Sequence, residues 1–273
     1  MANKESAVEK TLRLLEYRLI MEKAASCSMS AEAADMIRGE IPLADAAETE
    51  ALKARVSLAV SRFEKGDGEP GGSLPSIGFL LPGLEITGAA LDIDEVYAIG
   101  LFVERGGELV KWFLGEEKGR GIFGSLAELP LCASLSEEIF RVIDREGKLR
   151  DLPAFRAIKK RIAELSSRIE GAVMRYTGGE ETRRMLQSAV PSQRDGRVVL
   201  AVKANFRGRI RGIVHEVSST GQTVFVEPEE VVEGNNEILI EKRRLDAEIL
   251  RALRELTARI AESREELRIF HRE

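Results

Sequence analysis

Residues 194–228, RDGRVVLAVKANFRGRIRGIVHEVSSTGQTVFVEP, decide the fold, because here the apolar residues stop following a helical period and begin to alternate. The pair Asp195-Gly196 is a turn signal that predicts a β-hairpin. Two further turn signals, at 205–208 and 218–222, divide the rest into short alternating runs. The pattern predicts an antiparallel β module of about four strands over residues 184–227.

The run after the first turn shows the alternation most clearly. Three apolar residues should share one face of a strand, and two cations should lie exposed on the other face. The apolar residues are Val198, Leu200 and Val202, and the cations are Arg197 and Lys203.

Long helices are expected on both sides of the module. Between residues 152 and 176 apolar residues recur at steps of three and four, close to a coiled-coil seam. This seam consists of Phe155, Ile158, Ile162, Leu165, Ile169 and Val173. A second helix should begin at Pro228, with a seam of Leu245, Ile249, Leu253, Leu256, Ile260, Leu267 and Phe270. We predict that the two helices pack antiparallel through these seams. The second is still in progress at Glu273, as expected of a piece of a longer protein.

The first 150 residues predict a helical core. Helical periods occur over residues 6–27, 43–64, 92–118, 124–133 and 135–146, and Ser28 or Ser30 can cap one more helix. The predicted fold class is therefore mainly α: a helical core with two long antiparallel helices carrying a small inserted antiparallel β module. The expected divisions are the core at 1–150, the outgoing helix at 151–183, the β module at 184–227 and the returning helix at 228–273.

Length and composition limit the possible classes of protein. At about 150 residues per domain, 273 residues suggest two domains, and 44% apolar residues can form a core. No run approaches the ~20 apolar residues of a membrane span, and the charged N-terminus is unlike a signal peptide. Two separated cysteines, Cys27 and Cys132, and only two histidines exclude a disulfide framework and a histidine-rich metal centre. We expect a cytoplasmic protein that does not bind membranes.

The common catalytic motifs give no assignment. The sequence has no GxxxxGK[ST] loop, and the GxGxxG match at 119–124 joins two predicted helices without a preceding strand, which favours an incidental match. His215 has no second histidine, cysteine or carboxylate cluster near it in the sequence, so we interpret it as a structural or surface residue. Phe102 and Phe225, each in a Phe-x-Glu triplet, are interpreted as core residues. We predict no enzymatic activity and no cofactor in this chain.

Positive charge is concentrated in the β module. From residue 183 to 211 eight cations accompany one acid, Asp195, although the whole chain has a net charge of −5. The cations are Arg183, Arg184, Arg194, Arg197, Lys203, Arg207, Arg209 and Arg211. Exposed arginines suit phosphate, because the guanidinium is a fixed fork of donors. The alternative is a solvated charged face that acidic neighbours partly neutralise.

The same segment resembles the clamp of the MutS-two branch of MutS proteins, where a sequence similar to RNGRYVIPVKAEYRG…GIVHDxSxSGxTLFIEPxxVVxLNN recurs. The similar residues run from Arg194 to Asn236, and the opening TLRLLEY at 11–17 is also similar. The resemblance implies a helical core, two lever helices and a clamp that touches DNA backbone without reading sequence. Two positions depart from the pattern: Ala201 replaces a proline, and Gly234 replaces a leucine.

The charge pattern and the resemblance together indicate the nucleic-acid-binding candidates. They are Arg194, Arg197, Lys203, Arg207, Arg209 and Arg211. The resemblance implies a non-catalytic fragment whose parent is an ATP-driven homodimer that closes on duplex or branched DNA and limits recombination. ATP and Mg²⁺ would then belong to an ATPase domain outside this sequence. This branch is also linked to collided ribosomes, so rRNA phosphates are an alternative partner, and a structural coiled-coil adaptor is another alternative.

Overall fold

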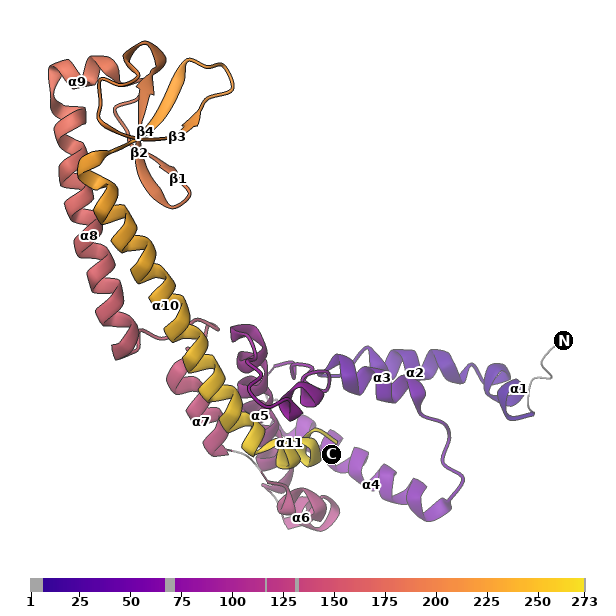
Figure 1. The fold of residues 1–273 in the computed structure, drawn as a ribbon. Helices are drawn as coiled ribbons and strands as arrows, with labels where there is room; N and C mark the ends of the chain where they lie inside the picture. Colours follow the sequence, from indigo (N-terminus) through magenta and orange to yellow (C-terminus); the bar gives the residue numbers. More distant parts are fainter. Residues whose placement is uncertain (1–6, 67–71, 116, 131–132, 273) are drawn as a thin grey trace. The chain divides into compact units, whose positions relative to one another are not determined.

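The computed structural model describes residues 7–66, 72–115, 117–130 and 133–272 (Figure 1). It confirms the predicted fold class, a mainly helical chain with a small four-stranded antiparallel sheet. The chain divides into two compact units, which we call the core unit (residues 1–150 and 253–273) and the sheet unit (residues 151–252). Helix α10 (Glu229–Glu262) contributes residues to both units.

The core unit is built almost entirely from helices. They are α1 (Ala7–Leu14), α2 (Tyr17–Ala25), α3 (Ala31–Gly39), α4 (Ala46–Lys65), α5 (Ile93–Leu114), α6 (Glu117–Ile122), α7 (Ala133–Val142), the end of α10, and α11 (Arg264–Arg272), with the 3₁₀ turns η1 (Leu81–Glu85) and η2 (Gly124–Glu128). The prediction of one helix over 6–27 is wrong, because Glu16 takes a left-handed conformation (φ 53°) between α1 and α2. The prediction of an α-helix over 124–133 is also wrong where η2 replaces it, and positions 131–132 lie outside the described residues.

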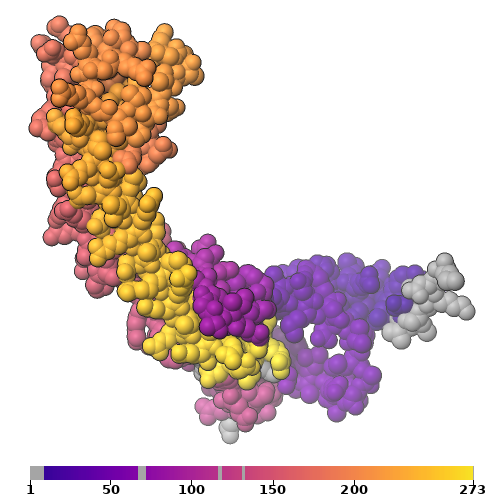
Figure 2. All heavy atoms as spheres, in the orientation of Figure 1, coloured from indigo at the N-terminus to yellow at the C-terminus, as the bar shows by residue number. Residues whose placement is uncertain are grey.

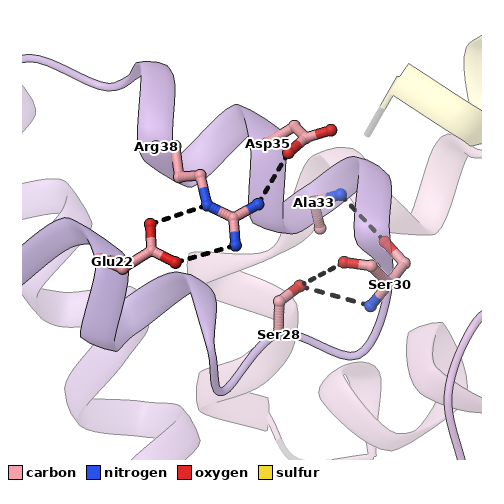
Figure 3. Close-up of polar contacts among 6 residues, drawn as sticks. All are labelled: Glu22, Ser28, Ser30, Ala33, Asp35 and Arg38. Atoms are coloured by element: carbon pink, nitrogen blue, oxygen red, sulfur yellow. Dashed lines mark hydrogen bonds and ion pairs between the residues drawn. The ribbon is translucent and has the colours of Figure 1, made fainter.

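Polar side chains hold helices α2 and α3 together as a hairpin (Figure 3). Ser30 caps α3 by accepting a hydrogen bond of 3.0 Å from the Ala33 amide, which confirms one of the two predicted caps. Away from the turn, the Arg38 guanidinium donates two hydrogen bonds, of 2.9 and 3.1 Å, to the Glu22 carboxylate. It also donates to Asp35. A bidentate pair has a defined geometry, so this exposed contact reports the register of the hairpin, although it contributes little energy.

Helix α5 lies at the centre of the core unit. Asp92 and Glu95 form a capping box at its start. Gly106 permits a close approach to α11, because a Cβ there would lie 2.8 Å from ring atoms of Phe270. Fully buried side chains of this core are Ile77, Val96, Ile99, Ile139, Ile143, Ile260 and Leu267. The last two show that the end of α10 and helix α11 belong to this core.

The sheet unit contains α8 (Pro153–Gly178), α9 (Glu180–Met185), four strands and the first part of α10. The strands are β1 (Ser192–Arg194), β2 (Arg197–Lys203), β3 (Gly212–Val217) and β4 (Thr223–Pro228), antiparallel in the order β1-β2-β4-β3. The predicted hairpin turn is confirmed, since Asp195 and Gly196 have φ values of 48° and 76°. Residues 204–211 lead from β2 to β3, which forms one edge of the sheet.

Strand β2 is buried on both faces, which differs from the predicted arrangement of one apolar and one exposed face. Leu200 and Val202 pack in the core of the sheet unit, and Val199 and Ala201, which alternate with them, are equally buried. Helix α10 supplies part of the cover, because its Asn235 side chain exchanges two hydrogen bonds of 3.1 Å with the backbone of Val198.

Helices α8 and α10 lie side by side and antiparallel in the sheet unit (Figure 1). Arg161 pairs with Glu237 and Arg175 pairs with Glu230, each at 2.7 Å, so the residue numbers rise on one helix as they fall on the other. Both long helices are therefore present where the periodicity predicted them.

The apolar seams of these helices have partners other than those predicted. On α8, Leu165, Ile169 and Val173 pack with the buried residues of the sheet. On α10 and α11, several predicted seam residues are buried in the core unit: Leu256, Ile260, Leu267 and Phe270. The predicted antiparallel packing is confirmed, and the α8 seam shares its cluster with Val231 and Ile238 of α10. The prediction is wrong for the last part of the second seam, which is buried in the core unit and not against α8. The periodicity identified which helix faces are buried, but not which surfaces cover them.

Candidate nucleic-acid interface

The loop of residues 204–211 carries three of the six candidate cations. It begins with the 3₁₀ turn η3 (Ala204–Phe206). Ile210 is only 6% exposed and packs in the core of the sheet unit, and Phe206 packs against the same core. These two side chains anchor the loop to the core of the sheet unit, and the residues between and beside them are exposed to solvent. The exposed cations are Arg207, Arg209 and Arg211.

These three arginines keep their donors free. Within the part of the chain that the structure describes, none of the three forms an ion pair or a side-chain hydrogen bond. A guanidinium in this state presents a planar fork of N–H donors that matches the oxygens of a phosphate. The loop can therefore bind an external anion without first breaking an internal contact.

Arg194 is engaged on two sides. Its Nε donates to Glu216 of β3, and its guanidinium carbon lies 3.7 Å from the centroid of the Phe225 ring on β4. The stacked cation covers Phe225, which was predicted to be a core residue and is half-buried. Arg194 would have to leave these partners to bind phosphate.

Arg197 is part of a polar cluster around a buried carboxylate. Its two terminal nitrogens donate to Glu227 at 2.8 Å and to the Asn236 side chain at 2.6 Å. Glu227 is fully buried and also contacts His215 Nε2 at 2.6 Å and the Asn235 amide nitrogen at 2.8 Å. We call these five residues the Glu227 cluster. It joins β2, β3 and β4 to the first turns of α10. Arg197 therefore contributes to holding these elements together.

The Glu227 cluster stabilises the ionised carboxylate. Burial raises the pKa of the Glu227 carboxyl, but hydrogen bonds from Asn235, His215 and Arg197 outweigh it, so the pKa lies below its ordinary value of 4.5. The structure gives His215 a carboxylate partner, Glu227, from a neighbouring strand. Sequence reasoning missed the cluster because the partners of His215 lie on other elements. The pairing of Ile213 with Glu227 across β3 and β4 would have indicated it.

Lys203, the last residue of β2, bends toward helix α9. Its Nζ donates to the backbone carbonyl of Arg184 at 3.0 Å. An ammonium has two further donors, so this contact leaves Lys203 able to bind a second group. Lys203 therefore links the end of the sheet to α9.

Arg211 lies in a different electrostatic setting. It lines a surface groove with Gly212, Ile213, Glu229, Val232, Glu233 and Asn236. A phosphate bound to Arg211 would also meet the carboxylates of Glu229 and Glu233. The six candidate cations thus divide into paired, partly engaged and free groups. The sequence could not distinguish these groups.

The remaining motifs do not form a second site. The GxGxxG match at 119–124 lies on α6 and η2, and a Cβ on Gly119 would meet the Phe113 carbonyl oxygen. Phe102 is a buried core residue, as predicted. Cys27 is exposed, and Cys132 lies outside the described residues. Among the described residues there is no group of three or more potential metal ligands, and no helix there is long and apolar enough to cross a membrane.

The chain is similar to several curated proteins, although no protein-family model matches it. It is 31% identical to Endonuclease MutS2 of Agathobacter rectalis over 236 residues, which are 84% of this chain and 30% of that protein. It is 28% identical to Endonuclease MutS2 of Symbiobacterium thermophilum over 93% of this chain and 32% of that protein. The protein of the same name from Thermotoga petrophila is 35% identical over 63% of this chain. The chain spans about a third of the length of the first two relatives.

Proposed function

The chain is a MutS-two-like protein along most of its length, and from that premise we propose that its sheet unit binds nucleic acid through the phosphate backbone. The observation that carries the proposal is the loop of residues 204–211. A buried isoleucine fixes this loop, and its three arginines are exposed and have no partner among the residues that the structure describes.

The aromatic residues of the sheet unit favour backbone contacts over base contacts. Proteins that bind single-stranded bases stack them on exposed aromatic rings. Here the Phe206 ring packs against the core, and the Arg194 guanidinium covers the Phe225 ring. Phosphate binding is therefore the mode that these residues support, and it carries no sequence preference of its own.

We propose duplex or branched DNA as the ligand, in line with the endonuclease named in the relatives. In this proposal the chain itself catalyses nothing. The whole protein would be a homodimer that uses ATP and Mg²⁺, bound outside these residues, to close around DNA and limit recombination. Ribosomal RNA presents the same phosphates, so competition between duplex DNA and ribosomes for the chain distinguishes the two ligands.

One observation favours the adaptor alternative. Strand β3 is at the edge of the sheet, and Ile213, Val214 and Val217 on it are between 41% and 49% exposed. An edge strand with exposed apolar side chains can pair with another protein. Such binding would depend little on salt, whereas phosphate binding would depend on it strongly.

A salt titration of duplex binding tests the proposal. If three arginines each contact a phosphate, the log–log slope of affinity against salt should be about −3. The triple variant Arg207→Glu, Arg209→Glu, Arg211→Glu should lose most of its affinity for all duplex sequences alike. A matched variant with the same charge change on the long helices, Arg168→Glu, Lys242→Glu, Arg243→Glu, should retain it. Equal binding by both variants, in protein shown to be folded, would contradict the proposal.

A further inference from the structure

The candidate cations lie at two ends of the sheet, and these ends differ in charge. At one end β2 stops, β4 starts, and the turn of residues 218–222 joins β3 to β4. We call this the α9 end. At the other end β4 stops and α10 starts. We call this the α10 end.

Direct contacts build the α9 end. Lys203 Nζ donates to the Arg184 carbonyl, and the Gln187 amide donates to the Ala201 carbonyl at 2.8 Å, so α9 lies against the end of β2. The Ala204 amide donates to the Gln222 carbonyl at 2.9 Å, which places the 218–222 turn beside the start of the 204–211 loop, which we call the arginine loop. In Figure 2 the salmon atoms of α9 and the orange atoms of the sheet form one surface at the top of the view.

The α9 end offers donors in excess of acids. Arg183 and Arg184, in the last turn of α9, are exposed, and no ion pair engages them within the described chain. In the turn, Ser218 accepts from the Thr223 amide and so shapes the backbone. The exposed Ser219 and Gln222 beside it can donate neutral hydrogen bonds, whereas the Thr220 hydroxyl lies 3.4 Å from the Ser218 hydroxyl and shares a hydrogen bond with it. The acids of α9, Glu180 and Glu181, lie in its first turn.

The α10 end repels an anion. Helix α10 opens with Glu229 and Glu230, and Glu233 follows one turn later. Glu230 is paired with Arg175 at 2.7 Å, which leaves Glu229 and Glu233 as the acids that an anion would meet. Two of these acids line the groove that contains Arg211. Arg197, which lies at the same end, is already neutralised by Glu227 at 2.8 Å. A phosphate backbone laid across this end would meet more uncompensated carboxylates than free cations.

From this asymmetry we infer that the nucleic acid lies against the α9 end, where Arg183 and Arg184 add phosphate contacts to those of Arg207 and Arg209. The inference rests on the proposed function. It predicts that substitutions at the α9 end and at the α10 end have unequal effects on binding. The 218–222 turn then lies at the edge of the bound backbone and donates hydrogen bonds from its hydroxyl and amide groups.

Two variants of the full chain test the inference, with a 20-base-pair DNA duplex as the probe. Arg183→Glu, Arg184→Glu should weaken binding about a hundredfold, because charge-assisted contacts to two phosphates are replaced by repulsion. Glu229→Gln, Glu233→Gln, which removes the charge of the two acids in the Arg211 groove, should change affinity less than twofold. Arg168→Glu, Arg243→Glu serves as the charge-matched control, and thermal melting verifies folding of every variant.

The outcomes separate this inference from the proposed function. Wild-type affinity in the α9 variant, or a tightening of fivefold or more in the α10 variant, overturns the inference. If the triple variant of the arginine loop still loses binding in that case, the proposed function stands. If wild-type protein shows no salt-dependent binding to duplex DNA, the proposed function fails as well.

Discussion

At the scale of single residues, Glu227 organises the sheet unit. It is a fully buried carboxylate with polar partners from β2, β3 and α10. A buried charge is tolerated only when its hydrogen bonds are made, and removal of one partner leaves the others uncompensated. Glu227 is thus more important for stability than any surface ion pair of the unit, such as Arg194 with Glu216.

We expect Glu227→Ala to destabilise the sheet unit by about 3–5 kcal/mol, because Arg197 and His215 lose their buried acceptor. Glu216→Ala, which removes a half-exposed partner of Arg194, should cost at most about 1 kcal/mol. Hydrogen exchange of the β2 and β4 amides measures both effects. Similar protection in the two variants would contradict the assignment of Glu227 as the central residue.

The same carboxylate predicts a pH dependence. Since hydrogen bonds hold the pKa of Glu227 below 4.5, its contribution to stability is complete above that pH and is lost as the pH falls through the lowered value. Wild type should therefore lose stability in urea unfolding below about pH 4.5, and Glu227→Gln should lose less over the same interval. Parallel curves for the two proteins would show that other acids account for the loss.

Two glycines of the sheet unit should respond in opposite directions to alanine. A Cβ at Gly212 would lie 2.0 Å from the Glu227 carbonyl oxygen, so Gly212→Ala must separate β3 from β4. At Gly171 on α8 a Cβ meets no atom within 4 Å, so Gly171→Ala should stabilise the helix by about 0.5–1 kcal/mol. Chemical denaturation of both variants, followed by circular dichroism, measures whether each substitution raises or lowers the free energy of unfolding.

At the scale of elements, the long helices are held together differently along their length. Near the sheet, apolar residues of α8 and α10 share one core with the strands. Between the helices, ion pairs such as Arg161 with Glu237 connect exposed side chains. Exposed pairs contribute little energy, so they report the register of the helices more than they stabilise it.

Charge exchange across α8 and α10 tests this register. Arg161→Glu should cost about 0.5–1 kcal/mol through repulsion by Glu237, and adding Glu237→Arg should recover most of that loss. The coupling should decrease in 1 M salt, because these side chains are solvent-exposed. A double variant that is no more stable than the single variant would show that the two residues do not interact.

At the scale of the whole molecule, the chain contains two separate cores. The core unit buries residues of α5, α7, α10 and α11, and the sheet unit buries residues of α8, β2, β4 and the start of α10. The single tryptophan, Trp112, belongs to the core unit, so its fluorescence reports on that unit alone.

We expect the two cores to respond separately to mutation. Leu165 is fully buried in the sheet unit, so Leu165→Ala should lower the protection of β2 amides by about 2–5 kcal/mol. The unfolding transition seen by Trp112 fluorescence should move by less than about 0.5 kcal/mol. Leu250→Ala, at a position 42% exposed, is the control and should change neither signal appreciably. Equal shifts of both signals would indicate one cooperative unit.

The sequence by itself determined most of the elements, because helix period, strand alternation and turn chemistry are short-range. Asp195-Gly196 predicted its hairpin from two residues, and the step of three and four predicted α8 almost to its ends. The same short-range patterns gave one wrong prediction: Glu16 interrupts a helix that the apolar pattern predicts to be continuous.

Only the tertiary structure decided which cations are free to bind a ligand. Arg194 meets Glu216 across 22 positions of sequence, and Arg197 meets Glu227 and Asn236 across 30 and 39. The arginines of the 204–211 loop escape such pairing because Ile210 anchors the loop and turns its neighbours outward. The number of cations in the sequence does not show which of them are paired, because pairing depends on which strands and helices become neighbours in space.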